Sequence, residues 1–136
     1  MRLSGSCLCG QLRYVADAET PMAAVCHCSN CQKQTGSAFS WLVIVPSAQL
    51  RHSGTLKTYL DRGDSGSVVR RQFCPDCGSP LFSEMDSAPG ITAIKAGTLD
   101  DGSALTPVMH VWCDSAQPWS SIPSDMPRFA QQPPAA

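Results

Sequence analysis

Residues 74–78 read Cys-Pro-Asp-Cys-Gly, and this short stretch is the most informative in the sequence. The proline fixes φ within the turn, and the glycine after the second cysteine allows the positive φ that such a turn needs. This geometry points backbone N–H groups at the two sulfurs, which helps a group of thiolates to bear its negative charge. A redox Cys-x-x-Cys pair opens a helix after a strand, whereas Pro80 opposes a helix here. We therefore interpret Cys74 and Cys77 as metal ligands.

A second pair with the same features lies near the N-terminus. Cys7 and Cys9 are separated by one residue, and a glycine, Gly10, again follows the second cysteine. Zinc in a closed protein site takes four ligands, so the two pairs together predict a Cys₄ site of structural character. Such a site would join the N-terminal segment to the middle of the chain.

Residues 26–31 carry three more cysteines, Cys26, Cys28 and Cys31. Three protein ligands leave one position of a tetrahedral zinc open, which is the pattern of catalytic zinc. His27 could close the site as a fourth ligand. However, a residue between two ligands of an extended segment points away from them, so we favour a packed or hydrogen-bonded imidazole beside the site. The eighth cysteine, Cys113, lies in an alternating strand and is interpreted as a buried apolar thiol, with approach to a metal as the alternative.

The composition fits one small domain. A chain of 136 residues is of single-domain length, and a net charge of −1 argues against nucleic acid or an anionic membrane as a partner. No apolar run has the length of a signal peptide or a membrane span, so we expect the cytoplasm, where thiols stay reduced. We expect a domain at residues 1–129 and a disordered tail at 130–136. The oligomeric state stays open.

Outside the cysteine clusters the sequence predicts short strands separated by turns rich in glycine and proline. One short helix is expected at residues 29–35, with Ser29 or Asn30 as its N-cap. We therefore predict a mainly β, antiparallel architecture with one helix after the second cysteine cluster. The seven expected strands are residues 11–15, 39–45, 55–60, 67–73, 81–85, 91–96 and 107–113.

Three segments carry a family resemblance: residues 5–10 (GSCLCG), 26–33 (CHCSNCQK) and 71–81 (RQFCPDCGSPL). With weaker matches downstream, they resemble the glutathione-dependent formaldehyde-activating enzyme family, whose domain also occurs in the centromere protein V group. The resemblance runs from Gly5 to about Phe129. It implies the Mss4-like, β-tent fold, in which zinc pins small antiparallel sheets together. It also implies two zinc ions: a structural one held by Cys7, Cys9, Cys74 and Cys77, and a catalytic one held by Cys26, Cys28 and Cys31.

The resemblance further implies a reaction. In this family glutathione joins formaldehyde to give S-hydroxymethylglutathione, so we expect a zinc-dependent enzyme of the carbon–sulfur lyase type with glutathione as cosubstrate. An open zinc site suits this chemistry, because a thiol attacks a carbonyl as the thiolate. Three thiolates leave the site negative, so an anionic ligand needs positive charge nearby, for which Lys33 and His110 are our candidates. We expect Arg71 at the structural site or in a surface pair. The alternative to an enzyme is a binding or scaffold module in which both zinc ions only stabilise the fold.

Overall fold

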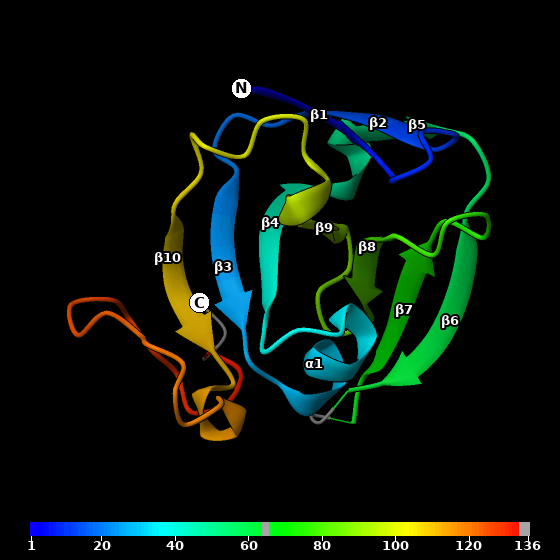
Figure 1. Ribbon diagram of the computed structural model, residues 1–136. Helices are drawn as coiled ribbons and strands as arrows, with labels where there is room; N and C mark the ends of the chain where they lie inside the picture. Colours follow the sequence, from blue (N-terminus) through cyan, green and yellow to red (C-terminus); the bar gives the residue numbers. More distant parts are fainter. Residues whose placement is uncertain (64–65, 134–136) are drawn as a thin grey trace.

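The computed structural model describes residues 1–63 and 66–133, whose strands form two sheets (Figure 1). The small sheet contains, in spatial order, β1 (Arg2–Ser6), β2 (Arg13–Asp17) and β5 (Leu50–Ser53). The large sheet contains, in spatial order, β10 (Pro107–Val111), β3 (Met22–Cys26), β4 (Ser40–Pro46), β9 (Ile91–Lys95), β8 (Pro80–Met85), β7 (Val68–Phe73) and β6 (Lys57–Arg62). Neighbouring strands are antiparallel, except that β10 runs parallel to β3. The predicted mainly β fold is confirmed.

The α-helix α1 (Ser29–Thr35) has the predicted bounds, but its N-cap differs from the prediction. Cys28 caps it, since the sulfur of Cys28 accepts a hydrogen bond from the backbone N–H of Cys31 at 3.2 Å. The cysteine-rich turn is therefore itself the first turn of the helix, and Ser29 and Asn30 are not needed as caps. Three short 3₁₀ helices complete the described elements: η1 (Ser47–Gln49), η2 (Ala96–Thr98) and η3 (Cys113–Ser115).

All seven predicted strands form, with ends that differ from the prediction by at most two residues. Three further strands, β1, β3 and β5, were missed. Their sequences are rich in Ala, Ser, Arg and Gly rather than in β-branched or aromatic residues, and such segments become strands through pairing with their neighbours.

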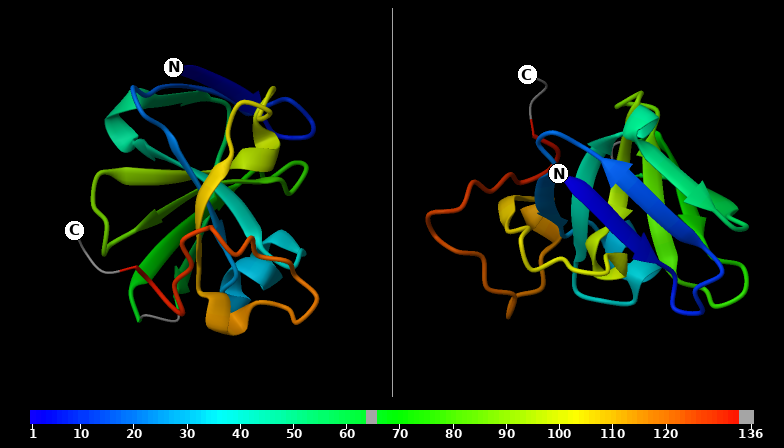
Figure 2. Two further views of the ribbon diagram at one scale, coloured as in Figure 1. Left: turned by 90° about the vertical axis from the view of Figure 1, so that its left-hand side faces the viewer. Right: turned by 90° about the horizontal axis from the view of Figure 1, so that it is seen from above.

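The two faces of the large sheet pack against different parts of the molecule. One face packs against the small sheet in the main core, where the rings of Tyr14 and Phe82 meet edge to face at 5.2 Å. Figures 1 and 2 show the small sheet at one end of the molecule and α1 at the other. Successive residues of a strand point to opposite faces of a sheet. The neighbours of the core residues therefore lie on the second face of the large sheet, where Leu42 and Lys95 are paired. This second face positions the candidate site.

The chain after β10 returns alongside it. His110 donates its backbone N–H to Pro127 and accepts one from Phe129, and Trp112 donates its backbone N–H to Gln131. This segment carries the predicted domain boundary at residues 129 and 130. Of the predicted tail, residues 134–136 lie outside the described residues, and the boundary stays a prediction.

Candidate metal centres and the adjoining cavity

The first cysteine cluster brings together the two pairs that the sequence predicts to act together. The sulfurs of Cys7, Cys9, Cys74 and Cys77 all lie within 4.8 Å of one another. Cys7 and Cys9 are separated by 3.6 Å between sulfurs, and Cys9 and Cys74 by 3.9 Å. A tetrahedron with zinc–sulfur bonds of about 2.3 Å has edges of about 3.8 Å, and all the cysteines are free thiols. The donor set and its spacing therefore fit zinc.

The backbone at this cluster has the predicted turn geometry. Gly10 and Gly78 adopt φ of 81° and 79°. Each donates its N–H to the carbonyl of the first cysteine of its pair, Gly10 to Cys7 at 3.2 Å and Gly78 to Cys74 at 2.9 Å. A side chain with a Cβ is strained at such φ values, so glycine is the residue that both turns require.

Hydrogen-bond donors surround these sulfurs. The hydroxyl of Ser79 and then the backbone N–H groups of Cys9 and Ser79 lower the pKa of Cys77 to about 5. The side-chain amide of Gln11 donates to the sulfur of Cys74 at 3.1 Å. Such donors stabilise the thiolate, which is the form of cysteine that binds a metal.

The second cluster joins the end of β3 to the start of α1. The sulfurs of Cys26, Cys28 and Cys31 also lie within 4.8 Å of one another, and all three residues are buried. Within residues 1–63 and 66–133, no histidine or carboxylate completes this group. The three sulfurs fit three corners of a tetrahedral zinc site and leave the fourth open.

His27 points away from the sulfurs, as its position between two ligands predicts. Its imidazole is fully buried, and its Nε2 lies 2.9 Å from Nδ1 of His110, with the two rings stacked. Burial lowers the pKa of both imidazoles. The structure thus brings His110 to His27, and His110 is not among the residues that line the cavity beside the cluster.

That cavity has a volume of about 260 Å³ and contains all three cysteines in its wall. Its floor is the second face of the large sheet, including Ala24 and Leu42, and Val111 and Trp112 lie at its β10 side. Lys33 lies elsewhere: it lines a separate hollow of about 470 Å³. Both hollows share Arg71 in their walls.

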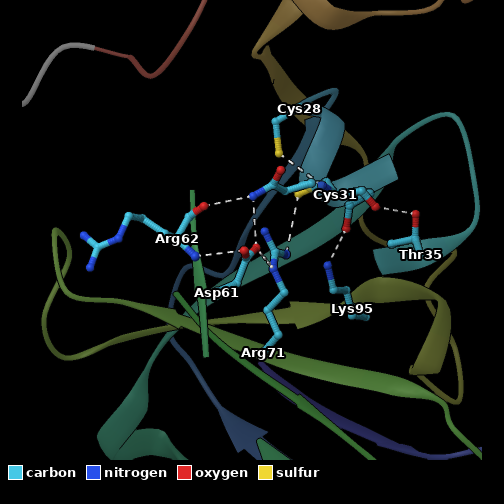
Figure 3. A network of polar contacts seen from close by, with 9 residues as sticks. Cys28, Cys31, Thr35, Asp61, Arg62, Arg71 and Lys95 are labelled. Atoms are coloured by element: carbon cyan, nitrogen blue, oxygen red, sulfur yellow. Dashed lines mark hydrogen bonds and ion pairs between the residues drawn. The ribbon is translucent and has the colours of Figure 1, made fainter. Parts of the chain in front are cut away.

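Two buried cations adjoin the cysteines in this cavity. Lys95 is only 5% exposed, and its Nζ donates to the hydroxyl of Ser40 at 2.8 Å. Arg71, also 5% exposed, forms an ion pair with Asp61 at 2.7 Å, and its Nη1 lies 3.9 Å from the sulfur of Cys31. Figure 3 shows both side chains reaching from the large sheet toward Cys28 and Cys31 at the start of α1.

These cations correct the sequence analysis in two respects. Arg71 is neither at the Cys₄ cluster nor on the surface, because its register position opposite Ser83 places it on the cavity face of the sheet. Lys95 was not singled out at all, although a lysine that ends the apolar run of β9 is unusual in a buried strand. That exception is the signal that could have found it.

The cations favour thiolates at the second cluster. Hydrogen bonds from the thiols of Cys26 and Cys28, together with the charges of Lys95 and Arg71, lower the pKa of Cys31. Cys26 shifts in the opposite direction: its hydrogen bonds with Cys28 and Cys31 raise the pKa of its thiol. The cluster thus holds thiolate charge beside Arg71 and Lys95, and burial lowers the pKa of Lys95.

Cys113 belongs to neither cluster. It begins η3 and is half-buried rather than buried. The alternation predicted through residue 113 ends early, because Trp112 adopts φ of 56° and turns the chain out of β10.

No helix among the described residues has the length and hydropathy to cross a lipid bilayer.

Comparison with known proteins identifies relatives of this chain. The family model described as "Glutathione-dependent formaldehyde-activating enzyme" matches residues 2–115. A Schizosaccharomyces pombe protein named as an uncharacterized lyase is 28% identical over 78 residues, which are 57% of this chain and 54% of that protein. An Aspergillus flavus protein named "Putative glutathione-dependent formaldehyde-activating enzyme" is 29% identical over 82 residues, which are 59% of this chain and 42% of the Aspergillus protein. The chain spans about half the length of the curated relatives it matches.

A solved structure supports the fold. The crystal structure of a Rhodobacter sphaeroides protein superposes with a TM-score of 0.58 at 22% identity, over 71% of this chain and 87% of that one.

Proposed function

Because the chain belongs to the glutathione-dependent formaldehyde-activating enzyme family, we propose that it is a zinc-dependent enzyme of the carbon–sulfur lyase type that acts on a thiol–aldehyde adduct. The reaction we propose joins glutathione and formaldehyde into S-hydroxymethylglutathione, or reverses that step. The observation that carries the proposal is the set of three cysteine sulfurs in the wall of a cavity that also contains two buried cations.

The two clusters would have different tasks. Cys7, Cys9, Cys74 and Cys77 would hold a structural zinc, since four thiolates leave no open position. The catalytic site would consist of Cys26, Cys28 and Cys31. A zinc ion bound there would supply a Lewis acid with one open position for a thiol or an aldehyde oxygen.

The buried cations would act on the charge that the reaction creates. The thiolate sulfur attacks the carbonyl carbon, a carbon–sulfur bond forms, and the π pair of the carbonyl moves to the oxygen, which then takes the proton that the thiol lost. Lys95 has three N–H donors and uses one on Ser40, so it can donate to this oxygen. Arg71, held by Asp61, would offset the charge of the thiolates. Fixed donors in a buried site stabilise such an oxyanion strongly.

The remaining candidates would act at a distance from the cysteines. Lys33 lines the hollow on the other side of Arg71, where it would meet a carboxylate of a glutathione that extends out of the cavity. His110 would orient the segment between Cys26 and Cys28 through its bond to His27. All the cysteines are free, and we propose a reducing compartment, the cytoplasm, in which they stay so.

The metal content tests the two-site assignment. Purified protein with fully reduced thiols should contain close to two zinc ions per chain, because the two sulfur clusters are separate and each fits a tetrahedral site. Native mass spectrometry and elemental analysis measure this ratio. A content of one or no zinc at full reduction contradicts the assignment.

Exchange spectroscopy tests the activity. In NMR exchange spectra of glutathione with formaldehyde, the protein should speed the interconversion of free and adduct forms above the uncatalysed rate. Lys95→Met keeps a long apolar side chain but removes the charge, and we expect it to lower the enhancement on the order of a hundredfold, as for the loss of one oxyanion donor.

Lys57→Met is the matched control, since Lys57 is exposed on the edge strand β6, and its enhancement should equal that of the wild type. If the wild-type protein gives no enhancement over the uncatalysed reaction, the activity proposed here is wrong and the scaffold alternative gains.

A further inference from the structure

The cavity wall changes from polar to apolar along the strands of the large sheet. Cys26 pairs with Ser40 at one end, and Lys95 pairs with Leu42 in the next row. The following row contains Ser83 together with Met22 and Ile44, and the cavity wall one row further is apolar, with Val69 and Met85 paired there. The apolar residues of this end of the wall are Met22, Ile44, Val69, Met85 and Ile91, and Met109 lies beside them on β10. Formaldehyde, with a single carbon, has no group that could occupy this apolar part.

The volume of the cavity limits what does occupy it. An apolar cavity of about 150 Å³ holds one benzene molecule, and this cavity has about 260 Å³. An aldehyde with about eight non-hydrogen atoms fits such a space, whereas glutathione, with about twenty, does not. The charged and amide groups of glutathione would also lose their hydrogen bonds against methionine and isoleucine side chains. The group that enters the apolar end is therefore small and apolar.

A buried hydroxyl indicates which reactant carries that group. Ser83 is 9% exposed and lines the cavity, and its Oγ has no hydrogen-bond partner among the described residues. Lys95 lies diagonally across from Ser83 on the same face and retains unused N–H donors. Both groups can donate a hydrogen bond to an oxygen atom of the reactant. A carbonyl oxygen accepts such hydrogen bonds well, whereas a thiol sulfur is a weak acceptor. The apolar group therefore belongs to the carbonyl reactant.

We propose that the site takes an aldehyde with an apolar substituent about the size of a benzene ring. The substituent lies against Met22, Met85 and Met109, and the carbonyl oxygen accepts hydrogen bonds from Ser83 and Lys95. The reaction of this aldehyde with a thiol rests on the function proposed above, but its binding does not require turnover and is measured separately.

Methionine methyl groups give a direct reading of this binding. The chain has five methionines; Met22, Met85 and Met109 line the cavity, whereas Met1 and Met126 do not. In ¹³C-methyl spectra of the zinc-loaded full-length chain without thiol, benzaldehyde should shift the three cavity methyls saturably, with a Kd of about 1 mM or tighter. The other two methyls serve as internal controls and should not move.

Two variants address the two halves of the proposal. Ser83→Ala removes only the hydroxyl and should weaken benzaldehyde binding about three- to tenfold. Ala24→Leu adds bulk to the cavity floor and should abolish the saturable shifts. Ser53→Ala, an exposed serine on β5, is the matched control and should bind like the wild type. Unchanged or uniformly shifted methionine methyls in the wild-type protein overturn the proposal, as does equal binding by Ser83→Ala.

The two proposals fail separately. If the protein speeds the glutathione–formaldehyde exchange but benzaldehyde leaves the cavity methyls unmoved, the substrate class is wrong and the proposed function stands. If benzaldehyde binds as described but no thiol exchange is enhanced, the substrate-binding proposal stands and the proposed function is wrong.

Discussion

A Cys74→Ser protein will lose one zinc ion and its cooperative unfolding transition. Cys74 is fully buried, belongs to the main core and contributes to a cluster that joins the segment before β2 to the turn between β7 and β8. Structural zinc in small domains contributes about 10–16 kcal/mol of binding free energy to folding, which matches or exceeds the whole stability of a typical domain, about 5–15 kcal/mol. Circular dichroism melts and native mass spectrometry measure the two losses.

Cys113→Ser is the control for this experiment. Cys113 is half-buried and lies outside both clusters, so its replacement should change the unfolding free energy by no more than about 0.5 kcal/mol. A Cys74→Ser protein that melts within a few degrees of the wild type would show that the Cys₄ cluster does not hold the fold together.

Cys28→Ser will give the opposite combination: a folded protein with one zinc ion and no enhancement of thiol–aldehyde exchange. Serine is among the best N-cap residues, so its hydroxyl can replace the sulfur that accepts the N–H of Cys31. The helix is retained, while a neutral hydroxyl is a poor substitute for a zinc-binding thiolate. The fold is read from amide NMR spectra, the metal from mass spectrometry and the activity from exchange spectra.

The same variant separates an enzyme from a scaffold. If both zinc ions only stabilise the fold, Cys28→Ser should unfold as Cys74→Ser does. If the protein stays folded and loses exchange activity, the second cluster is a functional site. Cys113→Ser again serves as the control that loses one thiol but neither zinc nor activity.

The sequence predicts those parts of the molecule that depend on local patterns. Each cysteine pair followed by glycine specifies a turn by itself, and Gly10 and Gly78 adopt the positive φ that follows from this. The bounds of α1 follow equally from a short run of polar residues that begins inside a cysteine cluster. The grouping of the cysteines into four and three came from ligand number and spacing, which are local chemical rules.

The environment of the second cluster depends on register across the sheet and could not be predicted in this way. Lys95, Arg71 and Ser83 come from three different strands, and only the pairing of β7, β8 and β9 brings them to one face. The parallel pairing of β10 with β3 likewise joins segments far apart in the chain. Alternation assigns residues to one face or the other of a strand, but it does not say which neighbour each strand will have.

The two clusters also differ in how far apart their ligands lie along the chain. This separation sets the order in which a chain leaving the ribosome can bind metal ions. Cys9 and Cys74 are 65 residues apart, so the Cys₄ site cannot assemble until the chain has been synthesised past Cys77. Cys26 and Cys31 are close neighbours, and closing the shorter loop costs about 2 kcal/mol less in chain entropy. The cluster proposed to be catalytic is thus the first able to bind a metal ion, and the cluster proposed to be structural is completed last.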